Sequence, residues 1–197
     1  MNTTLSQAIH ALHQGNVIVY PTDTLYALGA DIFNRTAVQK VYKLKKRPLS
    51  SPLPVAVSSL GQLKSIAYTT QRIEHVIHHF LPGPLAIILR KKSIVPDIVT
   101  NSSDKIAIRM PNNSMALHLL KTFGPLTATS ANLHTQKTPY LIKDIAMQFN
   151  GEIAVYLDSN KLDGQPSTMV DLTTAQPTIL RQGPISKQQI MEAIQHG

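Results

Sequence analysis

Two short polar segments, far apart in the sequence, carry the side chains best suited to bind a polyphosphate. The first is Lys45-Lys46-Arg47-Pro48, and the second is Thr129-Ser130-Ala131-Asn132, which follows an apolar run. Cationic side chains neutralise phosphate oxygens, and a hydroxyl and a carboxamide add directional hydrogen bonds. If folding brings the two segments together, they form a phosphate-binding site. Neither is informative alone, because cations near the end of a helix also complement its dipole.

Two arginines are further candidate ligands. Arg109 lies in the strand 106–110, and Arg181 lies in a later segment near the end of the chain. Because side chains alternate along a strand, Arg109 faces away from the core if Ile106 and Ile108 face it. An arginine at the rim of a crevice can hold a carboxylate, and each charge-assisted hydrogen bond contributes roughly 1.5–3 kcal/mol. A solvated surface arginine is the alternative at both positions.

The segment Pro21-Thr22-Asp23-Thr24 directly follows a buried strand, so its hydroxyls and its carboxylate are expected at a sheet edge. Proline, threonine and aspartate are also common in turns and helix caps, and this interpretation fits equally well. Whether Asp23 serves chemistry or a turn therefore stays open from the residues alone.

Several kinds of chemistry are disfavoured. The nine glycines are never adjacent and form neither a Walker A loop nor a Gly-x-Gly-x-x-Gly motif, and cysteine is absent. His75, His78 and His79 are expected on the solvated face of a helix, so they predict no metal site. The expected chemistry is the positioning of reactants and the neutralisation of phosphate charge, with Mg²⁺ carried mainly by the phosphates.

Composition predicts one globular domain over residues 1–197, with 43% hydrophobic and 15% charged residues. The net charge of +8 favours anionic partners such as nucleotides or RNA. The N-terminus lacks the pattern of a secretory signal, and no apolar stretch is long enough to span a bilayer. A cytoplasmic location without a membrane partner is therefore predicted.

Helical and strand patterns alternate along the chain, which predicts an α/β domain with helices packed on a central twisted sheet. Ligands of such folds tend to bind at the ends of the strands. Helices are expected over residues 5–15, 34–47, 70–80, 114–123, 140–149 and from 186 onward. Strands are expected over residues 17–20, 53–57, 85–89, 106–110, 126–129, 153–157 and 168–172.

Seven blocks, in order, resemble the YrdC/TsaC family of threonylcarbamoyl-AMP synthases. They are Pro21-Thr22-Asp23-Thr24-Leu25-Tyr26-Ala27-Leu28-Gly29-Ala30, Lys45-x-Arg47-Pro48, Phe80-Leu81-Pro82-Gly83-Pro84-Leu85, Ala107-Ile108-Arg109-Met110-Pro111, Ser130-Ala131-Asn132, Ser167-Thr168-Met169-Val170-Asp171-Leu172 and Ile179-Leu180-Arg181. The resemblance covers nearly the whole chain and implies a single-domain α/β-twist fold with a mixed sheet.

The resemblance also implies a nucleotidyltransferase reaction that joins L-threonine, bicarbonate and ATP into L-threonylcarbamoyl-AMP and releases pyrophosphate. The product serves N6-threonylcarbamoylation of tRNA adenosine, so the implied partners include the tRNA threonylcarbamoyl-transfer machinery and possible tRNA or double-stranded RNA. The residues implied for ATP are Lys43, Lys45, Arg47, Ser130, Asn132 and Arg181, of which Lys45, Arg47, Ser130 and Asn132 are implied as catalytic. The residues implied for L-threonine are Thr24, Arg109 and Ser167.

Some positions depart from the family pattern, namely Leu81, Ala86, Pro166 and Leu133-His134-Thr135. They bear on the detail of the pocket more than on the type of reaction. The main alternative is a non-catalytic double-stranded RNA-binding or ribosome-maturation module, which would use the same basic residues. A third interpretation is the related carbamoyl-transfer domain of hydrogenase-maturation proteins. Aromatic content of only 5% disfavours single-strand binding by base stacking.

Overall fold

The positions of the candidate residues are set by two mixed β-sheets and by the helices that cover them. The structure is a computed structural model and describes residues 3–195. The helices are α1 (Thr3–His13), α2 (Arg35–Lys45), α3 (Leu60–Ile66), α4 (Gln71–Phe80), α5 (Asp97–Thr100), α6 (Ser114–Phe123), α7 (Ile142–Gln148) and α8 (Lys187–Gln195). The strands are β1 (Ile18–Tyr20), β2 (Ala27–Gly29), β3 (Val55–Ala56), β4 (Leu85–Arg90), β5 (Lys105–Arg109), β6 (Leu126–Thr127), β7 (Thr129–Ser130), β8 (Val155–Tyr156), β9 (Thr168–Asp171) and β10 (Thr178–Arg181).

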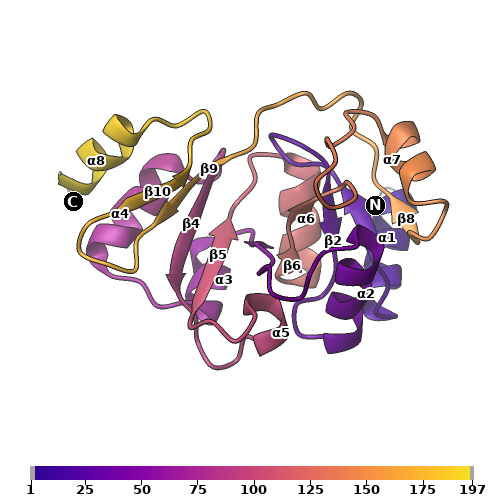
Figure 1. Cartoon of the computed structure of the whole chain (residues 1–197), viewed down its shortest axis with the longest axis horizontal. Helices are drawn as coiled ribbons and strands as arrows, with labels where there is room; N and C mark the ends of the chain where they lie inside the picture. The colour runs from indigo at the N-terminus through magenta and orange to yellow at the C-terminus, as the bar shows by residue number, and fades with distance from the viewer. Residues whose placement is uncertain (1–2, 196–197) are drawn as a thin grey trace.

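The strands divide between a four-stranded sheet, with order β7-β2-β1-β8, and a six-stranded sheet, with order β10-β9-β4-β5-β3-β6. Both sheets are mixed: β1 runs antiparallel to β2 and parallel to β8, and β4 runs antiparallel to β5 and parallel to β9. In Figure 1 the six-stranded sheet lies with α4 and α8 on one side of the view, and the other sheet lies with α1 and α2 opposite. The predicted α/β class with helices flanking a mixed sheet is confirmed, but the strands expected in one central sheet are divided between two.

Local sequence explains where several helices begin. The side chains of Asn34 and Thr70 accept hydrogen bonds from backbone amides of the first turns of α2 and α4. Ser186 does the same for α8, since its Oγ accepts from the amide of Gln189 at 3.2 Å. Each cap satisfies a backbone donor that the helix itself leaves free. The three helix starts predicted at these residues are confirmed.

Other expectations are corrected. The single strand expected over 126–129 is two strands in different sheets, because the chain crosses from β6 to β7 at Ala128. Helix α2 ends at Lys45 rather than at Pro48, since Lys46 adopts the left-handed conformation at φ 51°. The short elements β2, α3, α5 and β10 were not expected, because their brief apolar patterns do not stand out from loops.

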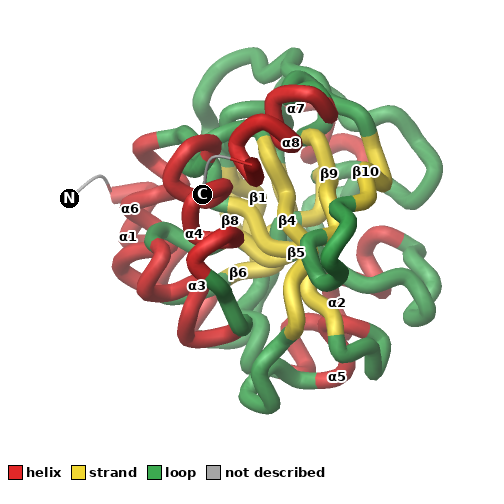
Figure 2. Tube along the Cα trace, turned by 90° about the vertical axis from the view of Figure 1, so that its left-hand side faces the viewer, coloured by secondary structure: helices red, strands yellow, loops and turns green. Residues whose placement is uncertain are grey.

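The hydrophobic core joins the two sheets. One continuous cluster includes Leu28 of the four-stranded sheet, Ile108 of the six-stranded sheet and Val41 of α2, all with 0% exposure. A second cluster packs α1 against α6 through Leu12 and Leu119. Figure 2 shows the strands in the middle of the molecule with helices around them. Within residues 3–195, none of the helices has the length and apolar character that a bilayer crossing requires.

Candidate functional site

A cavity of about 520 Å³ is lined by segments of both sheets. Its floor is the open face of the six-stranded sheet, to which β5 contributes Lys105, Ala107 and Arg109. The alternate residues Ile106 and Ile108 are buried in the core on the opposite face. The predicted orientation of Arg109 is therefore confirmed. A cavity of this size suits a small-molecule ligand.

Arg109 is buried in a polar network rather than exposed on the surface. Its Nη1 donates to Thr24 Oγ1 at 3.0 Å, and its Nη2 donates to the carboxylate of Asp23 in an ion pair. Thr24 Oγ1 also lies 3.1 Å from Thr22 Oγ1. Burial lowers the pKa of Arg109, while the Asp23 charge acts in the opposite direction. Asp23 is thus the charge partner of a cavity arginine, which the residues alone left open.

Several polar atoms near Arg109 have no partner. In the described residues, the buried side-chain atoms without a hydrogen bond are Asp23 Oδ2, Arg109 Nε, Ser167 Oγ and, away from the cavity on β8, Tyr156 Oη. Arg109 and Ser167 both line the cavity. Buried polar groups are nearly always hydrogen-bonded, so unpaired donors in a cavity wall indicate a place for a polar ligand.

Arg181 lies beside this group. Its Nε donates to the backbone oxygen of Ser167 at 2.9 Å, so β10 fixes the start of β9. Burial lowers the pKa of Arg181, and the charge of Arg109 adds to this effect. Two arginines therefore face the same cavity close enough to repel each other, which favours an anionic ligand between them.

The end of α2 separates the two basic residues of the Lys-x-Arg motif. The amide of Lys46 bonds to Lys43 O and the amide of Arg47 bonds to Tyr42 O, both at 3.0 Å, which is the Schellman pattern. Arg47 leaves the helix, donates to Ser51 O at 3.1 Å and Pro52 O at 3.0 Å, and lines the cavity. Burial lowers its pKa.

Lys45, the last helical residue, turns inward instead. Its Nζ donates to Ser130 O at 2.5 Å, Asn132 O at 2.7 Å and Asn132 Oδ1 at 3.2 Å, and the residue is 2% exposed. Burial and the nearby Arg47 lower its pKa to about 7, whereas the three acceptors favour the ammonium form. The two polar segments predicted to meet do meet, through Lys45 and Asn132.

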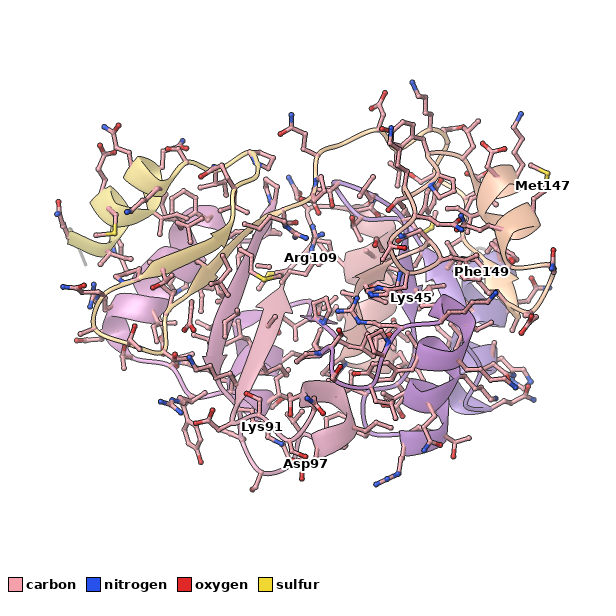
Figure 3. All side chains as sticks on the ribbon, in the orientation of Figure 1. Lys45, Lys91, Asp97, Arg109, Met147 and Phe149 are labelled. Carbon is pink, nitrogen blue, oxygen red and sulfur yellow. The ribbon has the colours of Figure 1, made fainter. Side chains whose placement is uncertain are left out.

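The predicted site residues fall into three places. Those that line the cavity are Thr24, Arg47, Arg109, Ser130, Ser167 and Arg181. Lys45 and Asn132 lie behind this lining and bind each other. Lys43 lies on a separate hollow of about 310 Å³ formed with Lys40 and Glu152. The structure therefore does not bring Lys43 together with the rest, and its role with ATP stays a prediction. Figure 3 shows Lys45 on the α2 side and Arg109 on the β5 side of the middle of the molecule.

Sequence reasoning missed several lining residues, among them Lys105, Asp171 and Tyr26. Lys105 and Asp171 form an ion pair at 2.8 Å on the floor, and Tyr26 lines the wall. Alternation along β5 could have identified Lys105, which lies four residues before Arg109 on the same face. Of the positions that depart from the family pattern, Ala86 and Pro166 line the cavity. His75, His78 and His79 are exposed.

Comparisons with known proteins show which proteins the whole chain is similar to. A threonylcarbamoyl-AMP synthase of Pyrococcus abyssi is 33% identical over 186 residues, which is 93% of this chain and 55% of that protein. The crystal structure of P. abyssi Sua5 complexed with L-threonine superimposes with a TM-score of 0.92 and 32% identity, covering 96% of this chain and 57% of that one. The structure of E. coli YciO gives 0.87 and 25%, covering 94% and 92%.

The chain thus spans about half the length of the P. abyssi relatives and nearly all of YciO. The model of the Sua5/YciO/YrdC family, described as telomere recombination, matches residues 10–183. This match includes every residue that lines the cavity. The chain belongs to the Sua5/YciO/YrdC family.

Proposed function

We propose that the chain is a threonylcarbamoyl-AMP synthase, a nucleotidyltransferase that converts ATP, L-threonine and bicarbonate to L-threonylcarbamoyl-AMP and pyrophosphate. The observation that carries this proposal is the pair of unpartnered buried groups, Arg109 Nε and Ser167 Oγ, in a cavity that Arg47 and Arg181 also line. These groups suit a carboxylate beside a polyphosphate. A relative of known fold binds L-threonine, as the P. abyssi complex records.

The amino-acid substrate would lie at the Arg109 end. Arg109 retains an unpaired Nε donor for the carboxylate of threonine. Thr24 Oγ1 is hydrogen-bonded to Arg109 and Ser167 lines the same cavity, so their hydroxyls would bind the other polar atoms of threonine. The arginine is already oriented by Asp23, so little side-chain freedom is lost when the substrate binds.

The nucleotide would use the cationic wall. Arg47 and Arg181 neutralise phosphate charge, and Ser130 supplies a hydroxyl. Mg²⁺ would enter on the phosphates of ATP, because Asp171, which lines the cavity, and Asp23, which binds the cavity residue Arg109, are both already paired with cations. The phosphate oxygens of ATP are then the ligands that remain for Mg²⁺.

The reaction then needs mainly orientation. The ammonium group of threonine first loses a proton to solvent. The neutral amine then attacks the carbon of bicarbonate and displaces water, or adds to the carbon of carbon dioxide and loses a second proton to solvent, and either route gives a carbamate. A carbamate oxygen attacks the α-phosphorus in line, and pyrophosphate leaves. The cavity holds the reactants together and offsets the charge that develops on the leaving group. Transfer of the product to tRNA, binding of tRNA and a cytoplasmic location stay predictions.

Pyrophosphate release by the purified protein tests the proposal. We expect release only when ATP, L-threonine, bicarbonate and Mg²⁺ are all present, and ¹³C-bicarbonate should add one labelled carbon to a threonine–AMP adduct in mass spectra. A Lys46→Met variant, which removes an exposed charge from the same helix end, serves as control. Pyrophosphate release that is independent of threonine would contradict the proposal. RNA binding without any turnover would support the RNA-binding alternative instead.

A further inference from the structure

Lys45 belongs to a compact polar cluster, the Lys45 cluster, which consists of Lys45, Ser130, Asn132 and Thr138. Asn132 Oδ1 accepts from Lys45 at 3.2 Å, Ser130 Oγ at 2.5 Å and Thr138 Oγ1 at 3.3 Å. Asn132 Nδ2 donates to Leu133 O and to Gln136 O. The cluster therefore joins the end of α2 to the segment that follows β7.

The ammonium of Lys45 has no donor left for a ligand. It carries three N–H groups and faces three oxygens, of which two are backbone carbonyls of Ser130 and Asn132. The residue is 2% exposed and does not line the cavity. Contact with a phosphate would first break bonds that hold the wall of the cavity.

We propose that Lys45 is a positioning residue, which holds the backbone of Ser130 and Asn132 so that Ser130 and Arg47 present a preformed wall to the nucleotide. The backbone supports the same connection in the other direction, since the amide of His134 donates to Lys45 O at 2.7 Å. The kinetic consequences of this role rest on the proposed function, but its structural consequences do not.

The cluster also explains how Ser130 is free to meet a ligand. Its hydroxyl donates to Asn132 Oδ1 in this structure. When the hydroxyl turns toward the cavity, Asn132 Oδ1 keeps Lys45 and Thr138 as donors, so no buried acceptor is left unpaired. Lys45 thereby lowers the free-energy cost of the rotation of Ser130.

Hydrogen exchange of the nucleotide-free protein tests the structural part. Lys45→Met removes the ammonium but keeps an unbranched side chain, and Lys46→Met removes an exposed charge one residue away as a matched control. We expect faster exchange of the amides of residues 131–134 in Lys45→Met alone. Unchanged exchange there would overturn the proposal, whether or not the protein is a threonylcarbamoyl-AMP synthase.

A double-mutant cycle tests the kinetic part. Lys45→Met should lower kcat/KM for ATP by roughly 10- to 100-fold in the otherwise native protein, but by less than about 3-fold in a Ser130→Ala background, because it acts through that residue. Equal losses in both backgrounds would mean that Lys45 contacts the nucleotide directly, which would overturn the proposal. If the wild-type protein releases no pyrophosphate, the proposed function fails and the exchange result still decides the inference.

Lys45→Arg covers the case in which Lys45→Met does not fold. Arginine keeps the charge, but its planar group does not match three closely spaced oxygens. A positioning role therefore predicts faster exchange of residues 131–134 and a loss of nucleotide affinity that approaches the loss in Lys45→Met. An affinity within about 2-fold of the native value, measured with a non-hydrolysable ATP analogue, would mean that the charge alone matters and would overturn the proposal.

Discussion

The two polar groups that flank the cavity differ in whether their hydrogen bonds are complete. In the Lys45 cluster, every polar side-chain atom of Lys45 and Asn132 has a partner within the protein. Near Arg109, in contrast, Arg109 Nε, Asp23 Oδ2 and Ser167 Oγ are buried without one. Both groups are buried, and both were predicted to contact substrate. Because hydrogen bonding is complete in one group and incomplete in the other, we assign the two groups different roles.

Saturation matters because a buried unpaired polar atom destabilises the fold unless a ligand satisfies it. The penalty is about 1–3 kcal/mol for each group, which a saturated cluster avoids. The residues at the Arg109 end therefore keep groups free to bind a substrate, and the Lys45 cluster keeps the wall of the cavity rigid. Sequence motifs do not separate these tasks, because Lys45 and Arg47 lie in the same motif and are directed apart only by the turn at Lys46.

Breaking the Asp23–Arg109 pair should have the largest effect. We expect Arg109→Gln to lower threonine-dependent pyrophosphate release by about 100-fold or more, because the carboxylate of threonine loses its cation. The free energy of unfolding should fall by about 3–5 kcal/mol, because Asp23 remains as an uncompensated buried charge. Kinetic assays and urea denaturation measure the two effects separately.

The double variant Asp23→Asn/Arg109→Gln sharpens this result. It removes both charges, so most of the lost stability should return. Activity should not return, because the cation is still absent. Recovery of threonine affinity in the double variant would mean that Arg109 serves the fold and not the substrate.

The sequence predicts most of the fold because the apolar periodicity is strong where elements are long. Helices capped by Asn34 and Thr70 and the strand containing Ile106 and Ile108 lie where they were expected. The division into two sheets was not predictable, since it depends on the change of partner at Ala128 between β6 and β7. Pairing partners of two-residue strands are set by tertiary contacts rather than by local sequence.

The site was predicted as a set of residues but not as a set of contacts. Alternation along β5 placed Arg109 correctly, while its partner Asp23, 86 positions away in sequence, could only come from the folded chain. Lys45 is the clearest example of this limit. Its charge and motif indicate a phosphate ligand, but its 2% exposure follows from the packing of α2 against the segment after β7.

Gly164→Ala should have an intermediate effect and is specific to the Arg109 end. The amide of Gly164 donates to Thr24 O at 3.1 Å, and a Cβ at this position would lie 2.7 Å from the same oxygen. The backbone must then move, which we expect to cost about 1–3 kcal/mol of stability and to raise KM for threonine. Gly61→Ala, in α3, is the control, because its Cβ would lie 3.7 Å from Ser59 Oγ, which is an ordinary contact distance. Equal behaviour of the two variants would argue against a role for the segment around Gly164.

Ser130→Ala tests the Lys45 cluster, in which hydrogen bonding is complete, and should have a smaller effect on stability. Its Oγ donates to Asn132 Oδ1, so removal should cost about 1 kcal/mol, as for a typical net hydrogen bond. Thermal or urea unfolding without ligands measures this loss. A variant as stable as the native protein would mean that the Lys45 cluster does not depend on the hydroxyl.

Ser167→Ala is the matched change on the unsaturated side and should leave stability almost unaltered. Its Oγ is buried without a partner, so removing it takes away no hydrogen bond and relieves an unpaired group. Threonine affinity should nevertheless fall by roughly 3- to 10-fold, because the hydroxyl gains its partner only in the complex. Calorimetric titration with threonine, set beside the unfolding of both serine variants, completes the comparison. If Ser167→Ala loses stability and keeps its threonine affinity, the hydroxyl serves the fold, and incomplete hydrogen bonding no longer identifies the substrate end of the cavity.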